Sequence, residues 1–406
     1  MNEKRILAWQ LYAQTLLLLV LYSAASLMTA IKFMPSDPLS IALPYMEISS
    51  LSHVLIELAI LTGLFATSVY FLFTEVKKIM LWVYRAWTAF LVITVIAGLS
   101  DMFTGRHLLE LPLLLDAALF TLVVAWSYVL FTGKDNAGKL VLMTGMGFVI
   151  TGILVSLFPA NNPLNDRILR VITVNMRFFV GYPLTGLAIL YWLYNDIPIN
   201  AGAGILAAVG SIVSIAPLNA IGVINLPAVI LVPLIFIGMF YVVRALTSST
   251  RAWQNVGILL MALGMGVLGT LFVIPSVGSY AVGTRLADLQ ITLVTWSVML
   301  FILSSLSDSL VNTQIETTTY GNSLTFWLVS GGIVAGTQAL LLAGVVQLLL
   351  ERVLGVGYLD TQTVLVPLYV LWIVGILIWS VGIAKYAYHF LGSGMHLPKY
   401  RTAEES

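Results

Sequence analysis

The stretch GMGVLGTLFVIPSVGSYAVGTRLADLQIT, residues 264–292, joins the end of one apolar run to the beginning of the next. A glycine-rich apolar segment ends near Pro275, a short loop follows, and a second long apolar run begins near Thr284. Apolar runs of about 20 residues, each able to cross roughly 30 Å of hydrocarbon as a helix, recur along the chain. This alternation of apolar runs and short polar breaks predicts helices joined by short loops in a membrane.

The composition supports the same fold class. The chain is 60% hydrophobic and 9% charged, with a mean hydropathy of +1.00. We therefore predict an all-α polytopic membrane protein made of a single transmembrane domain, residues 1–406. About twelve spans are expected, near residues 8–31, 52–74, 79–100, 108–132, 139–159, 171–195, 202–222, 224–247, 253–275, 284–310, 323–350 and 362–391.

The charges predict an orientation and exclude several functions. Lysine and arginine are more frequent in the loops on the side of the N-terminus, so both termini are expected to be cytoplasmic in the cell membrane. A net charge of +1 argues against a nucleic-acid surface, and the absence of cysteine excludes disulfides and thiolate metal sites. The first span carries no cleavage signal and is expected to be retained.

The skeleton of residues 264–292 resembles the segment from helix 9 to helix 10 of heme–copper oxidase subunit I, above all in the nitric oxide reductase and cbb-type branch. The run from Phe326 and Trp327 to Gln347 and Arg352 is similar to helix 11 of the reductases and its following loop. His53 stands where that family has its first heme ligand, with an aromatic residue, Tyr70, seventeen positions later. The resemblance implies an oxidase-like bundle of twelve helices.

The resemblance also implies that most metal ligands have been lost. The family's histidine pair of helix 10 falls on Gln290 and Thr292, the histidine of helix 6 on Gly181, and the pair of helix 7 on Pro217 and Leu218. Of the six histidines that the family uses, one remains. Because hemes and the third metal need imidazole ligands, reduction of oxygen or nitric oxide is not expected.

That remaining histidine, His53, leaves two interpretations open. It can bind a single b-type heme or contact a quinol, or it can be an interfacial side chain without a ligand. Glu57 lies one turn further along the same helix face. Asp116 and Arg177 are the other charges expected deep in the membrane, where they can pair with each other or with backbone carbonyls. Arg285 and Asp288 have the spacing of an ion pair at a helix start.

The resemblance leads to one expected function and two alternatives. We expect a non-catalytic membrane subunit of a respiratory electron-transfer complex that anchors a cytochrome partner, as in archaeal complexes with b-type cytochromes. The alternatives are an electron-transfer subunit that binds one heme or a quinol at His53, and a transporter unrelated to oxidases. No cofactor is expected beyond at most one heme b, although lipid or quinone can bind. Larger side chains or lipid are expected to fill the vacated heme volumes.

Overall fold

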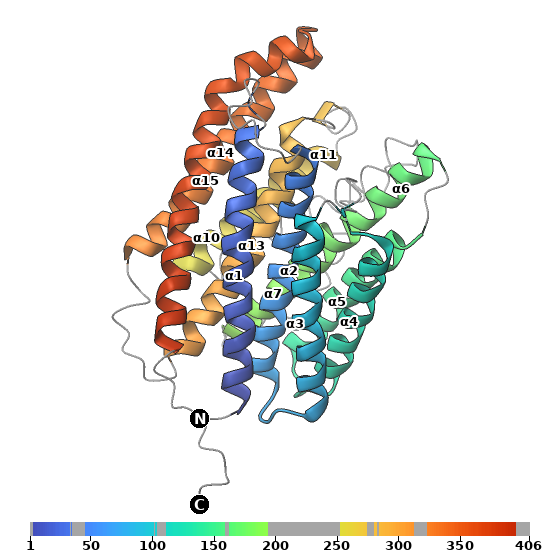
Figure 1. Ribbon diagram of the computed structural model, residues 1–406. Coiled ribbons are helices and arrows are strands. Elements are labelled where there is room, and N and C mark those ends of the chain that lie inside the picture. Colours follow the sequence, from blue (N-terminus) through green and yellow to red (C-terminus); the bar gives the residue numbers. More distant parts are fainter. Residues whose placement is uncertain are drawn as a thin grey trace, which may run out of the picture.

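The computed structural model is helical throughout the part of the chain that it describes (Figure 1). The described residues are 3–32, 34, 45–100, 102–103, 111–158, 162–193, 252–273, 280–281, 284–311 and 323–394. The expected spans 202–222 and 224–247, with Pro217 and Leu218, lie outside these residues. The helices are α1 (Glu3–Lys32), α2 (Tyr45–Leu72), α3 (Lys78–Leu99), α4 (Leu113–Phe131), α5 (Ala137–Ser156), α6 (Pro163–Val174), η1 (Asn175–Gly181), α7 (Tyr182–Leu193), α10 (Ala252–Met261), η3 (Ala262–Leu268), α11 (Gly269–Val273), α13 (Arg285–Val311), α14 (Ser323–Leu348), η4 (Leu349–Val353) and α15 (Tyr358–Gly394).

The membrane-spanning character predicted from composition is confirmed. Within the described residues, nine helical segments are long and apolar enough to cross a bilayer, and a tenth apolar segment, Trp253–Leu268, is shorter. These ten correspond in order to the expected spans outside 202–247. The chain is therefore an all-α polytopic membrane protein.

Burial separates inner helices from outer ones. In the apolar core of each span, 89% of the residues of α2 and of α13 are buried, against 28% for α15. Figure 1 shows α2, α7 and α13 behind α1, with α14 and α15 on one side and α3, α4 and α5 on the other. Because most of their residues are buried, the inner helices contact protein rather than lipid around most of their circumference.

The paired helices α14 and α15 owe their close contact to glycine. A Cβ atom on Gly375 would lie 2.6 Å from the backbone nitrogen of Gly336, and one on Gly332 would lie 2.4 Å from the nitrogen of Trp379. Small residues at such a crossing let two backbones approach closely, which favours helix association in lipid.

An aromatic cluster lies where this helix pair meets the centre of the bundle. Trp296 of α13 lies 4.7 Å from Trp379 of α15 and 6.1 Å from Tyr22 of α1, measured between ring centroids. The rings of Tyr22 and Trp379 are stacked at 5.5 Å. The cluster links α1, α13 and α15 and fixes the position of Tyr22, which lines the cavity described below.

Candidate functional site: a buried ion pair and a polar cavity

A buried ion pair connects α2 with η1. The guanidinium group of Arg177 donates to both carboxylate oxygens of Glu57, with Nε 2.7 Å from Oε1 and Nη2 bonded to Oε2. The hydroxyl of Tyr182 donates to the same Oε1 at 2.5 Å. All three side chains are buried. The positive charge of Arg177 balances the negative charge of the Glu57 carboxylate, and two donor groups satisfy its oxygen atoms inside the membrane.

A π-helical turn brings Arg177 and Tyr182 together. The backbone N–H of Tyr182 donates to the carbonyl of Arg177, five residues earlier, at the end of η1. In an α-helix, positions five apart face different directions, whereas the wider π turn brings them closer to one face. Single π turns are frequent at functional sites. The sequence analysis missed Tyr182 as a partner of Glu57 for this reason.

The proposed pairing of Asp116 with Arg177 does not occur. Arg177 bonds to Glu57 instead, and the hydroxyl of Ser156 on α5 donates to Asp116 at 3.4 Å. Glu57 is the nearer partner because α2 is an inner helix that contacts η1, whereas Asp116 lies in the first turn of the outer helix α4.

Helix α5 closes the space beside η1. A Cβ atom on Gly181 would lie 2.5 Å from Cγ2 of Val149 and 3.1 Å from the carbonyl oxygen of Gly145. A Cβ atom on Gly145 would in turn lie 2.8 Å from the carbonyl oxygen of Gly181. The two backbones are therefore in direct contact, and no larger side chain fits at position 181 without moving α5.

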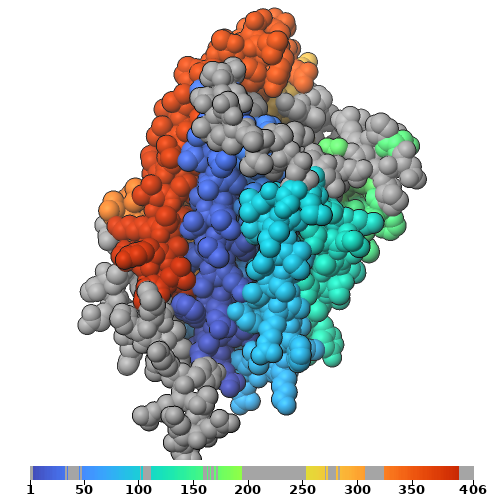
Figure 2. Space-filling model, viewed as in Figure 1, coloured from blue at the N-terminus to red at the C-terminus, as the bar shows by residue number. Residues whose placement is uncertain are grey.

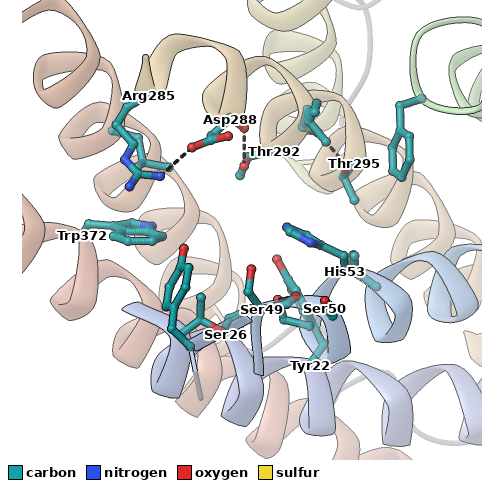
Figure 3. A pocket seen from close by; sticks show the side chains of 17 residues that line it. Tyr22, Ser26, Ser49, Ser50, His53, Arg285, Asp288, Thr292, Thr295 and Trp372 are labelled. Carbon is teal, nitrogen blue, oxygen red and sulfur yellow. Dashed lines mark hydrogen bonds and ion pairs between the residues drawn. The ribbon is translucent and has the colours of Figure 1, made fainter. Parts of the chain in front are cut away.

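A cavity lies one turn away from the ion pair, between α1, α2, η1, α13, α14 and α15, and its surface is mainly apolar with several polar side chains. Its volume is about 360 Å³, which is within the range of small-molecule sites (Figure 3). Figure 3 shows His53 across the cavity from Arg285 and Asp288, with Trp372 and Tyr22 at its sides. The full lining consists of Tyr22, Ser26, Thr29, Tyr45, Ser49, Ser50, Ser52, His53, Ile56, Phe178, Arg285, Asp288, Ile291, Thr292, Thr295, Leu340 and Trp372.

The start of α13 is held in place at the rim of this cavity. The predicted ion pair is confirmed: Nη1 of Arg285 lies 2.7 Å from Oδ2 of Asp288. The backbone N–H of Arg285 donates to Oε1 of Gln347 at 3.1 Å. A Cβ atom on Gly344 would lie 2.8 Å from the nitrogen of Leu286. Gly344 thus allows α14 to approach α13 closely, and Gln347 caps the start of α13. Together they hold the helix turn that carries Arg285 and Asp288.

Tyr45, at the beginning of α2, adds a neutral hydrogen-bonding group to the rim. Burial raises the pKa of its phenol above the ordinary value of 10.0, and the nearby Asp288 raises it further, while Arg285 and a hydrogen bond with Ser49 lower it. The net shift is upward because desolvation is the largest cause. Tyr45 therefore keeps its proton at neutral pH.

The ligand positions named by the family resemblance do not fit its metals. His53 supplies one imidazole to the cavity, and the facing helix supplies the hydroxyl of Thr292 and the carboxylate of Asp288, which do not suit a heme with two axial imidazoles. The amide of Gln290 donates to the carbonyl of Gly264 at 3.3 Å. Within the described residues, no group of three or more His, Asp or Glu side chains could hold a metal ion.

The expectation that larger side chains or lipid fill vacated heme volumes stays a prediction. The structure shows two different surroundings: at Gly181, helix α5 is in direct contact with the backbone. Between His53 and Thr292 lies a cavity with several polar side chains in its lining. His53, Thr292, Arg285 and Asp288 of this lining were candidates from the sequence. Tyr22, Tyr45 and the serines were not, because isolated hydroxyl side chains on apolar helices carry no motif.

Comparison with known proteins adds no assignment to these observations. A scan against protein-family models and a search of curated proteins found no match to this chain.

Proposed function

We propose that this chain is a membrane subunit of a respiratory electron-transfer complex and that it binds a quinol head group in the cavity beside His53. The observation that carries this proposal is the cavity itself, which places an imidazole on one wall and the Arg285–Asp288 pair on another. Small-molecule sites typically combine a mainly apolar lining with a few oriented polar groups.

The lining matches the chemistry of a quinol. A quinol head group is a flat ring with oxygen atoms at opposite ends, so it needs ring contacts along its faces and hydrogen bonds at both ends. Tyr22, Phe178 and Trp372 supply aromatic surface. His53 supplies an imidazole ring whose nitrogens can form a hydrogen bond with one of the oxygen atoms. Tyr45, with its raised pKa, supplies a neutral O–H donor.

The close packing of α5 against η1 supports the proposal that this subunit has no reduction centre of its own. At Gly181 the space for a metal-binding side chain is taken by α5, and Glu57 is engaged by Arg177 and Tyr182. Electrons from a quinol would therefore pass to a partner subunit, for which we propose a cytochrome. This keeps the anchoring role expected from the sequence and adds a ligand to it.

The charge pattern of the loops gives the proposal a direction across the membrane. The cavity is lined by residues at the beginning of α2 and of α13, which lie at the end of the bundle opposite the N-terminus in Figure 1. With both termini in the cytoplasm of a cell-membrane protein, that end faces outward. A quinol bound there would release its protons on the outer side.

The test is a binding titration with a short-chain quinone on the purified chain in detergent. Trp372 lines the cavity, so a bound quinone should quench its fluorescence, and Trp372→Phe should remove that quenching. His53→Ala should weaken binding roughly tenfold, the value of one lost hydrogen bond to a polar ligand atom. His389→Ala, on α15 outside the cavity lining, is the matched control and should leave binding unchanged.

Two results would contradict the proposal. Equal quinone affinity in wild type and His53→Ala would show that the quinone does not bind in this cavity. Solute uptake by liposomes that contain this chain alone, with no quinone binding, would support the transporter alternative instead.

A further inference from the structure

A shallow groove, separate from the proposed quinol cavity, lies open on the outer surface of α3. Its lining residues are Tyr84, Arg85, Thr88, Ala89, Val92 and Ile93. These positions repeat every three to four residues, so they form one continuous stripe along the helix. Figure 2 shows α1 and α3 next to each other on the face turned toward the viewer, with α3 open to the outside. In a bilayer this stripe faces lipid.

Arg85 is the unusual member of this stripe. It is exposed, and it lies seven residues after Lys78, the first residue of α3, which places it about 10 Å along the helix. Its guanidinium group lies 5.8 Å from the ring of Trp82, and the described residues offer it no hydrogen bond or ion pair. A lipid-facing cation at this depth is costly unless it reaches an anion at the membrane interface.

The polar end of the groove is already fixed in position. The side-chain amide of Gln14 on α1 donates to the hydroxyl of Tyr84 at 3.3 Å and to that of Thr88 at 2.9 Å. Thr88 in turn donates to the carbonyl of Tyr84 at 2.9 Å. These bonds hold α3 against α1 beside Arg85, so the exposed guanidinium group is the polar group that the groove offers to a ligand.

The other end of the groove is apolar, and the surrounding charge is positive. Val92 and Ile93, both 54% exposed, continue the stripe toward the middle of the bilayer. Lys77 and Lys78 lie at the beginning of α3, with one acidic side chain, Glu75, in the preceding turn. Basic pockets on the cytoplasmic side of membrane helices suit anionic lipid head groups.

We propose that this groove is a binding site for an anionic phospholipid, with the phosphate at Arg85 and an acyl chain along Val92 and Ile93. Arg85 provides the charge, and the apolar end of the stripe provides the surface for the chain. The site would secure α3, an outer helix with 33% of its apolar core buried, against the bundle.

Native mass spectrometry of the detergent-purified chain tests this proposal with phosphatidylglycerol and phosphatidylcholine of identical acyl chains as probes. We expect wild type to retain one phosphatidylglycerol in preference to phosphatidylcholine. Arg85→Gln should lower that retention roughly fivefold, the effect of one basic side chain near an anionic lipid. Lys134→Gln, which removes an exposed charge from the loop after α4 at the same end of the bundle, is the control and should have no effect.

A second variant tests the groove independently of the charge. Ala89→Phe keeps Arg85 and places a ring in the groove, so it should displace the lipid while leaving the positive charge intact. Equal retention of the two lipids by wild type would overturn the proposal. So would unchanged phosphatidylglycerol retention in both Arg85→Gln and Ala89→Phe.

Discussion

Glu57 and His53 lie one turn apart on α2, yet they face two regions built in opposite ways. Glu57 faces a closed region, in which Arg177 and Tyr182 occupy its carboxylate and α5 contacts η1 backbone to backbone. His53 faces a cavity of about 360 Å³ whose far wall carries Arg285 and Asp288. On the same helix, Glu57 therefore takes part in internal packing, whereas His53 lines a cavity.

The difference is that a neighbouring helix fills the space beside Gly181, whereas a cavity lies beside Thr292. Gly181 and Thr292 both stand where the resemblance expects a metal ligand. At Gly181 the backbone of α5 is in direct contact, and at Thr292 the side chain lines a cavity. The cavity beside Thr292 is large enough for a small ligand, and this distinction underlies the proposed quinol site.

The largest expected effect comes from removing one charge of the Glu57–Arg177 ion pair in the closed region. Arg177→Met leaves Glu57 buried without its positive partner, which should lower the free energy of unfolding by about 3–5 kcal/mol. Titration with a denaturing detergent in mixed micelles measures this change. The double variant Glu57→Met with Arg177→Met removes both charges and should recover most of the loss, since apolar replacements of a buried pair are often neutral. No recovery would mean that the pair is not the source of the effect.

Restoring a histidine should distinguish the two regions directly. Gly181→His forces a ring against Val149 and the α5 backbone and should cost about 3 kcal/mol or more in unfolding free energy. In Thr292→His the new side chain points into the cavity, and the unfolding free energy should change by less than about 1 kcal/mol. Parallel unfolding curves of the two variants provide the measurement. Similar losses in both would show that the two regions are packed alike.

A smaller effect is expected from two glycines on α5 that differ only in what they face. Gly145→Ala meets the carbonyl of Gly181 and should lower the free energy of unfolding by about 1–2 kcal/mol. Gly147 has no atom within 4 Å of an added Cβ, so Gly147→Ala should be neutral or stabilising by up to about 1 kcal/mol. The thermal midpoints of the two variants, which should move in opposite directions, provide the comparison.

The smallest effect concerns Tyr45 at the rim of the cavity. Its pKa is raised in the folded protein, so the folded state holds the phenol proton more tightly than the unfolded state does. The resulting stabilisation is present below the ordinary pKa of 10.0 and is lost as pH rises through the folded value. Thermal unfolding between pH 9 and 11 should therefore be less pH-dependent in Tyr45→Phe than in wild type, and an identical slope would contradict the burial of this phenol.

The fold class followed from the sequence because its cause is local. Runs of apolar residues about 20 long leave the backbone no alternative to helices in lipid, so the spans in the described residues were predicted in their observed order. The ion pair of Arg285 and Asp288 was equally predictable, since three positions on one helix determine it.

The candidate site was less accessible to sequence reasoning because it depends on contacts between distant segments. Glu57 and Arg177 are 120 positions apart, and the π turn that directs Arg177 and Tyr182 to one carboxylate has no sequence motif. The cavity next to His53 depends on how α1, α2 and α13 pack, which hydroxyl side chains scattered over three apolar helices do not reveal. The sequence identified His53 as a candidate, and the structure supplies its surroundings.

Photoaffinity labelling with an azido-quinone tests the central claim most directly, because it reports where the ligand lies. The account predicts labelled peptides from the cavity-lining parts of α2 and α13, residues 45–56 and 285–295, with labelling reduced by an excess of unmodified quinone. Label confined to the lipid-facing surfaces of the outer helices, or label that unmodified quinone does not displace, would contradict it.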